Sequence, residues 1–176
     1  MLLDQLCRAG VPVMGIGKIS DIFLNRGISE SLKTKNNSDG MQRTVEAMRK
    51  RQQGLIFVNL VDFDQQFGHR NDVEGYAQAL EAVDSWLPNL PLNDRDLVIL
   101  TADHGCDPTI LTSTDHSREY VPILAWGPNL GPGRDLGTRS SFGDMGVTIL
   151  DGFGLPSQGL VGESFADILW KEHAKC

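Results

Sequence analysis

Leu55-Ile-Phe-Val-Asn-Leu-Val61 is an almost unbroken apolar run, and Asp62-Phe-Asp64 follows it directly. A run of this kind is typical of a strand that is covered on both faces, as the strands of a parallel sheet are. Similar apolar runs occupy residues 11–16, 97–101 and 121–126. Pro122 predicts that the last of these is an edge strand or a strand entry, because proline cannot donate a ladder hydrogen bond.

Amphipathic stretches separate these runs. A first helix would contain Leu3, Leu6 and Cys7, and a second would begin at a cap on Ser38 or Asp39 and run to about residue 53. Further helices are predicted over residues 73–87, 142–153 and 164–173. The alternation predicts an α/β fold with a mostly parallel sheet flanked by helices, and 176 residues suit one domain.

The composition excludes some partners. A net charge of −7 and a pI near 5.0 argue against nucleic acid and anionic membranes as partners. No apolar run approaches the roughly 20 residues that a membrane span needs, and the first residues do not resemble a signal peptide. The cysteines Cys7, Cys106 and Cys176 are odd in number and scattered, which favours a reducing compartment. We therefore expect a cytoplasmic protein.

Three short segments carry both aspartate and histidine. Asp64 and His69 follow one apolar run, Asp103 and His104 follow another, and His116 lies in the loop after that. In parallel sheets ligands gather beyond the carboxyl ends of the strands. Imidazole and carboxylate ligands suit a first-row divalent metal, so we expect a binuclear metal site. Taken singly, each segment could instead be a helix cap or a surface turn.

The residues near these segments have several interpretations. Cys106 is either a further ligand or a small residue beside the site, and Asp115 is a candidate to orient a histidine. Two ions side by side suit phosphoryl transfer. Arg118 and Lys18 are candidate phosphate contacts, and Arg118 is the stronger because its guanidinium offers two parallel donors. The alternative for both is a solvated surface cation.

Five stretches of the sequence resemble bacterial phosphopentomutases, which belong to the alkaline-phosphatase superfamily. They are Gly-Ile-Gly-Lys-Ile-Ser-Asp-Ile-Phe (15–23), Thr-Lys-Asn-Asn-Ser-Asp-Gly-Met (34–41), Val-Asp-Phe-Asp-Gln-Gln-Phe-Gly-His-Arg-Asn-Asp-Val-Glu-Gly-Tyr-Ala (61–77), Thr-Ala-Asp-His-Gly-Cys-Asp-Pro (101–108) and Thr-Asp-His-Ser-Arg-Glu-Tyr-Val-Pro (114–122). The resemblance extends from near residue 1 to about residue 154. It implies an alkaline-phosphatase-like core, of which this chain is a part.

The resemblance also implies an activity and a set of site residues. Members of the family move phosphate between C1 and C5 of ribose or deoxyribose, usually with two manganese ions. By resemblance, Asp64, His69 and His116 would hold one ion, while Asp103 and His104 would contribute to the other. Lys18 matches a family lysine close to the reaction centre. The ligand types alone leave manganese, zinc and magnesium open.

Parts of the family pattern have no match in this sequence. The family's opening metal motif, its phosphate-carrying threonine and its cap domain would all precede residue 1. We therefore expect residues 1–176 to be the C-terminal part of the catalytic core, with no catalytic nucleophile and little mutase activity alone. One extra residue lies between His104 and His116, near residues 110–112. A metal-dependent phosphatase and a non-catalytic metal-binding remnant are the alternatives.

Overall fold

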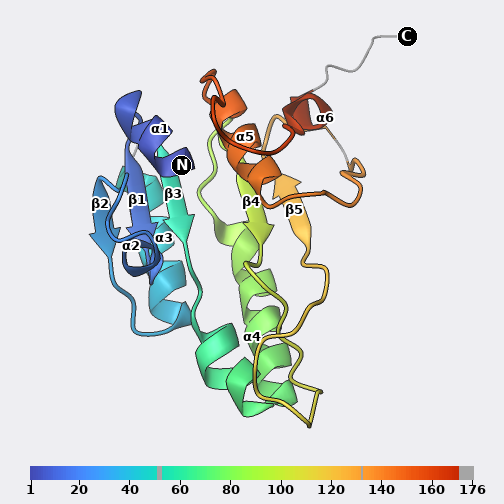
Figure 1. The fold of residues 1–176 in the computed structure, drawn as a ribbon. Helices are drawn as coiled ribbons and strands as arrows, with labels where there is room; N and C mark the ends of the chain where they lie inside the picture. Colours follow the sequence, from blue (N-terminus) through green and yellow to red (C-terminus); the bar gives the residue numbers. More distant parts are fainter. Residues whose placement is uncertain (51–52, 132, 171–176) are drawn as a thin grey trace.

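A parallel sheet forms the first part of the fold (Figure 1). The computed structural model describes residues 1–50, 53–131 and 133–170. The sheet has the order β2-β1-β3 and consists of β1 (Val13–Ile16), β2 (Glu30–Leu32) and β3 (Leu55–Val58). Met14 of β1 lies opposite Glu30 of β2 and Ile56 of β3. The apolar run that begins at Leu55 is thus a strand of a parallel sheet, as predicted, although the strand ends at Val58.

A separate pair of strands is antiparallel. β4 (Val98–Thr101) pairs with β5 (Ile123–Trp126), with Val98 opposite Trp126 and Thr101 opposite Ile123. Within the described part of the chain β5 pairs with β4 alone, which agrees with the edge position predicted from Pro122. The fold class, α/β with a parallel sheet flanked by helices, is confirmed.

Six α-helices accompany these strands in the described part of the chain (Figure 1). They are α1 (Leu2–Arg8), α2 (Ile19–Ile22), α3 (Asn37–Lys50), α4 (Val73–Trp86), α5 (Gly143–Gly152) and α6 (Ala166–Trp170). All the predicted helices are present, whereas α2 and β2 were not predicted. The predicted ends of α3 and α6 fall partly on residues 51–52 and 171–173, which lie outside the described residues.

The start of α3 differs from the prediction in one detail. The Asn36 side chain accepts a hydrogen bond from the Asp39 amide at 2.9 Å, so it performs the capping expected of Ser38 or Asp39. The Asp39 carboxylate instead accepts from the Lys35 amide at 3.0 Å and from Arg43 Nε at 2.8 Å. Asp39 therefore joins the chain before the helix to its first turns.

The core surrounds β1, all four of whose residues are buried. On one face, Leu3 and Leu6 of α1 and Leu150 of α5 pack around Val13. The opposite face presents Met14 and Ile16, which pack with Ala47 of α3. By contrast, β3, β4 and β5 contain half-buried and exposed residues only.

An ion pair fixes the start of α5. The Asp144 side chain is fully buried, and its Oδ2 accepts a hydrogen bond from Arg139 Nε at 2.8 Å. Its Oδ1 accepts from the Glu163 amide at 3.0 Å, which ties the chain before α6 to α5. Both oxygens thus have partners, as a buried charge requires.

Among the described residues, no helix combines the length and apolar character needed to cross a membrane.

Candidate metal centre

Two short helical turns position the first ligand segment. η1 (Phe63–Phe67) is a π-helix that carries Asp64, and η2 (Gly68–Arg70) is a 3-10 helix that carries His69. They lie between the end of β3 and the start of α4, at the carboxyl edge of the parallel sheet (Figure 1). π-turns are rare and occur often at functional sites. The tight succession of turns brings Asp64 and His69 together, although they lie five residues apart.

Two histidines converge on one carboxylate oxygen. Nε2 of His69 and Nε2 of His116 each lie 3.1 Å from Oδ1 of Asp64. The imidazole rings of the two histidines are stacked, with centroids 5.0 Å apart. The predicted meeting of the segments around Asp64, His69 and His116 is therefore present in the fold, although His116 is 52 residues from Asp64 in sequence.

A backbone carbonyl sets the tautomer of His69. Its Nδ1 lies 2.5 Å from the Thr114 carbonyl oxygen, which can only accept, so Nδ1 carries the proton. Nε2 is then the ring nitrogen that faces Asp64 and is available to an ion. Metal-binding histidines commonly donate their second ring N–H in this way, which fixes the ring orientation. This contact also joins the His69 segment to the loop that carries His116.

His104 extends the cluster on the other side of His116. Their ring centroids are 3.7 Å apart with planes inclined by 19°. Ligand atoms of Asp64, His104 and His116 all lie within 4.8 Å of one another, which is close enough for one ion. Asp103 lies at the rim, its side chain 74% exposed and its Oδ1 3.7 Å from His104 Nε2. Asp64 and His116 are thus shared between two candidate ligand sets, one with His69 and one with His104.

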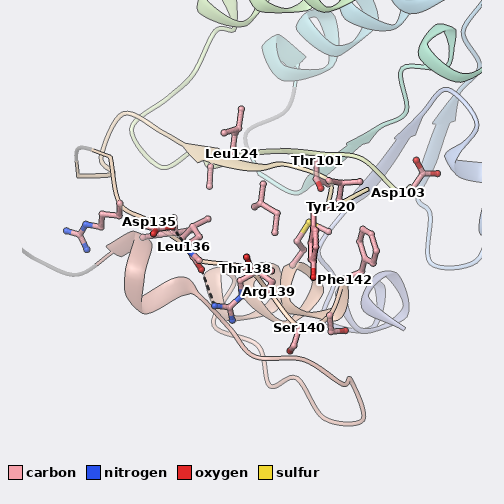
Figure 2. A pocket seen from close by; sticks show the side chains of 18 of the residues that line it. Thr101, Asp103, Tyr120, Leu124, Asp135, Leu136, Thr138, Arg139, Ser140 and Phe142 are labelled. Carbon is pink, nitrogen blue, oxygen red and sulfur yellow. Dashed lines mark hydrogen bonds between the residues drawn. The ribbon is translucent and has the colours of Figure 1, made fainter. Parts of the chain in front are cut away.

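The two candidate phosphate contacts occupy different places. Arg118 is exposed and lines an open cavity of about 950 Å³ together with Asp103 and His104. Figure 2 shows this cavity between the β4–β5 pair and the segment around Arg139. Lys18 precedes α2 at the carboxyl end of β1 and is half-buried. Within the described residues Lys18 is not part of the cavity lining, although it shares the carboxyl edge of the sheet with the site.

Asn71 supports the site and was not predicted. Its backbone is left-handed, with φ 53°, a conformation that asparagine adopts more readily than most residues. Its side-chain amide donates to the Ile110 carbonyl at 2.6 Å and to the Ser113 carbonyl at 3.1 Å. Asn71 therefore holds the loop before His116 against the turn that carries His69. Residue types near Asn71 in the sequence did not indicate these contacts, because the partners lie about 40 residues further along the chain.

Cys106 packs beside the site rather than pointing at the clustered ligands. A β-carbon at Gly68 would collide with its Sγ, so the thiol fills the space that this glycine leaves. Burial raises the pKa of the Cys106 thiol, and the nearby carboxylates of Asp64 and Glu119 raise it further. Among the described residues, the group whose ligand atoms are close enough for one ion consists of Asp64, His104 and His116 and does not include Cys106. This favours the interpretation of Cys106 as a packing residue.

Asp115 and Glu119 shape the His116 loop. Asp115 Oδ1 accepts a hydrogen bond from the backbone amide of His116 at 2.8 Å, so it orients the main chain and not the ring. Ser117 pairs with Gly105 in a β-bridge, and its hydroxyl donates to the Glu119 carboxylate. The bridge brings the segment that carries His104 alongside the segment that carries His116.

Comparison with known proteins gives the family. The sequence model of the Metalloenzyme superfamily matches residues 16–157, which include every candidate ligand. The chain belongs to the metalloenzyme superfamily. Among curated members it is 50% identical over 173 residues to the phosphopentomutase of Symbiobacterium thermophilum and 54% identical over 166 residues to that of Anaeromyxobacter sp. (strain K). The resemblance to phosphopentomutases is thereby confirmed.

These matches cover unequal shares of the proteins compared. The alignments include 97% and 93% of this chain but 44% and 42% of the two phosphopentomutases. This chain thus spans less than half the length of the curated relatives it matches.

Solved structures agree on the fold. The phosphoglycerate mutase of Leishmania mexicana superposes with a TM-score of 0.69 at 18% identity, covering 92% of this chain and 38% of that one. The PH0037 protein of Pyrococcus horikoshii gives a TM-score of 0.55 at 17% identity, covering 69% and 39%. At these identities the likeness concerns the α/β metalloenzyme fold alone.

Proposed function

We propose that this chain is the metal-binding part of a phosphopentomutase, an isomerase that moves phosphate between C1 and C5 of ribose or deoxyribose. One observation carries the proposal. Asp64, His69 and His116 converge within a chain that is half identical to phosphopentomutases. Under this proposal residues 1–176 are the C-terminal part of the catalytic core, and a pentose phosphate is the substrate.

The donor set fits divalent metal ions. Asp64, His69 and His116 would hold one ion, while Asp103 and His104 would contribute to a second. Carboxylate oxygen and imidazole nitrogen suit a first-row divalent metal, and on the resemblance to phosphopentomutases we assign two Mn²⁺ ions to the site. Such ions, when bound, neutralise the charge that develops on the attacking and leaving oxygens in phosphoryl transfer. The chain's own residues orient the ligands, as the Thr114 carbonyl does for His69.

Arg118 and Lys18 would bind the substrate phosphate. Arg118 lies on the cavity that also includes His104, and its guanidinium can donate two parallel hydrogen bonds to a phosphate. Lys18, at the carboxyl end of β1, offers a compact positive charge from a second direction. With no threonine that matches the family's nucleophile, the chain would bind metal and phosphate without carrying phosphate covalently.

Free thiols at Cys7 and Cys106 agree with a cytoplasmic location.

Metal titration with a paired assay tests the proposal. Isothermal titration of the chain with MnCl₂ should show binding that Asp64→Asn abolishes and Asp84→Asn preserves, because Asp84 is exposed on α4 away from the site. Phosphorus NMR with ribose 5-phosphate then follows both isomerisation to ribose 1-phosphate and release of inorganic phosphate. The expected result for the chain alone is metal binding with neither reaction.

Each other result has a distinct meaning. Absence of Mn²⁺ binding by the wild-type chain would overturn the proposed metal centre. Steady release of inorganic phosphate would identify a phosphatase instead. Isomerisation at enzymatic rates by the 176 residues alone would show that the chain contains its own phosphate carrier, contrary to the proposal.

A further inference from the structure

A short connecting segment, residues 59–62, leads from the carboxyl end of β3 to the turn that carries Asp64 (Figure 1). The Asn59 amide donates to the Ile16 carbonyl at 2.9 Å. A β-carbon at Gly17 would collide with the Asn59 carbonyl oxygen, so this residue lies directly against the end of β1. The first residue of the connecting segment is therefore fixed to the central strand of the sheet.

The last residue of the connecting segment is fixed to α3 by two reciprocal hydrogen bonds. The Asn37 amide donates to Asp62 Oδ2 at 2.7 Å, and the Asp62 amide donates to Asn37 Oδ1 at 2.9 Å. We call these two hydrogen bonds the reciprocal pair. Asn37 is the first residue of the 14-residue helix α3, so the Asp62 carboxylate lies where the helix dipole stabilises negative charge. Asp62 thus caps a helix that begins 25 residues before it in the sequence.

The Asn37 side chain is buried for the sake of its oxygen. It is 6% exposed, and among the described residues its Nδ2 has no hydrogen-bond partner. Burial of an amide nitrogen without a partner costs about 1–3 kcal/mol. The oxygen of the same side chain, which holds the Asp62 amide, has to offset this cost. The reciprocal pair is therefore the reason for an asparagine at this position.

The turn that carries Asp64 grows directly from the fixed segment. Val61 is buried, and its carbonyl accepts a hydrogen bond from the Gln65 amide at 3.1 Å, which closes the first turn of η1. Asp64 lies within this turn, two residues after Asp62. A shift of residue 62 would consequently move the Asp64 carboxylate.

The two histidines that face Asp64 are held from a different direction. The Thr114 carbonyl orients the ring of His69, and His116 lies in the loop that follows Thr114. Each histidine Nε2 lies 3.1 Å from Asp64 Oδ1. The carboxylate and the imidazoles thus reach the centre from two separately supported parts of the fold, and the reciprocal pair supports the carboxylate.

We infer that Asn37 and Asp62 are positioning residues of the metal centre. Their reciprocal pair fixes the Asp64 carboxylate at the place where His69 and His116 can share an ion with it. This inference rests on the proposed function, in which these three residues bind one ion. The helix α3, which carries none of the candidate ligands, would then determine how tightly the ion binds.

Titration of alanine variants with MnCl₂ tests the inference. Asn37→Ala and Asp62→Ala each remove one acceptor of the reciprocal pair, and each should weaken Mn²⁺ binding about tenfold or more, as loss of support around metal ligands does. Asp62→Asn keeps a side-chain oxygen that can accept from the Asn37 amide. Its Mn²⁺ affinity should stay near that of the wild type.

Asp39→Ala is the matched control. Asp39 supports the same end of α3, but it does so by accepting from the Lys35 amide and from Arg43 Nε, before the helix and within its first turns. Its loss should lower the free energy of unfolding without changing the Mn²⁺ affinity. A purely structural role for the reciprocal pair predicts the same behaviour for Asn37→Ala as for Asp39→Ala.

Hydrogen exchange on the wild-type chain gives a second readout, which decides if the alanine variants do not fold. Coupling between two equilibria is reciprocal, so an ion that depends on the pair must also strengthen it. NMR with and without ZnCl₂, a diamagnetic probe, should show the Asn37 and Asp62 amides exchanging about tenfold more slowly when Zn²⁺ is bound. The Lys35 amide, which donates to Asp39, should slow by much less.

The possible failures can be told apart. Wild-type Mn²⁺ affinity in both Asn37→Ala and Asp62→Ala would overturn the inference and leave the proposed metal centre intact. An equal loss of affinity in Asp39→Ala would also overturn it, because any weakening of the helix start would then suffice. A loss in Asp62→Asn as large as in Asp62→Ala would refute the role of the hydrogen bonds. Absence of Mn²⁺ binding by the wild type would overturn the metal centre together with the inference.

Discussion

The thiol of Cys106 occupies the space that a side chain at Gly68 would fill. This contact joins the turn that carries His69 to the segment that carries His104, so the two ligand segments pack without a gap. The backbone at Gly68 is in the ordinary helical region, with φ −60°. It is therefore space, and not backbone conformation, that requires glycine here.

Gly68→Ala should consequently weaken metal binding. The added methyl group collides with Cys106 and with the Phe63 carbonyl oxygen, and the two ligand segments must separate. Mutation of residues that support metal ligands commonly lowers metal affinity about 10- to 100-fold. We expect the Mn²⁺ affinity measured by titration to fall by a factor of that size. Cys106→Ala should bind Mn²⁺ almost as the wild type does. A loss as large for Cys106→Ala as for Gly68→Ala would show that the thiol is itself a ligand.

Asn71 should matter through its side chain. Asn71→Ala removes both hydrogen bonds to the 110–113 loop and also disfavours the left-handed backbone, so metal affinity should fall about tenfold. Asn71→Gly preserves the backbone freedom and loses only the hydrogen bonds. Titration of both with Mn²⁺ separates the two effects. Wild-type affinity in both variants would contradict a supporting role for Asn71.

The Asp144–Arg139 pair should dominate the stability of the C-terminal part. Asp144→Asn leaves the Arg139 guanidinium largely buried without its counter-charge, and breaking a buried pair typically costs about 3–5 kcal/mol. Urea unfolding should show a loss of that order, against a small change for the exposed control Asp84→Asn. A change below about 1 kcal/mol for Asp144→Asn would contradict this assignment.

Asp39 should give the fold an acid-sensitive element. The Lys35 amide that donates to it, with Arg43 beside it, holds the pKa of the Asp39 carboxyl below its usual range. A lowered folded-state pKa contributes stability above the unfolded-state pKa and loses it as pH falls through the folded-state value. Wild-type stability should therefore decrease more between pH 5 and pH 3 than that of Asp39→Asn, as thermal unfolding across this range would show. Parallel pH profiles would contradict the prediction.

The sequence predicted the parts of the fold that burial dictates. The continuous apolar run from Leu55 indicated a sheet strand, and the spacing of apolar residues indicated α4, which begins at Val73 as expected. The short elements α2 and β2 were missed because Glu30-Ser31-Leu32 lacks a hydrophobic pattern and α2 has only four residues. The antiparallel direction of β5 was not predicted either, since an apolar run does not indicate the direction of its strand.

Some features of the candidate site could likewise be predicted from the sequence, whereas others could not. Asp64 and His69 could be proposed because chemically distinctive residues follow a predicted strand, and His116 because it lies in the loop after the next such segment; the fold brings the three together. The π-turn at Asp64 and the capping by Asn36 depend on local backbone geometry that residue types do not encode singly. Asn71 acts through backbone carbonyls of a distant loop, so no pattern near it in sequence reveals its partners.

The separation of the ligands along the chain gives an ion here a mechanical role. Asp64 and His116 lie 52 residues apart, and His69 and Thr114 lie 45 apart, so an ion at this point closes a long loop. By analogy with a disulfide across a loop of that length, the closure restricts the unfolded chain by about 4 kcal/mol. Unlike a disulfide, a cross-link of this kind is lost whenever a chelator removes the ion. The supply of the divalent metal ion would then govern how long the polypeptide survives proteolysis, quite apart from any reaction it supports.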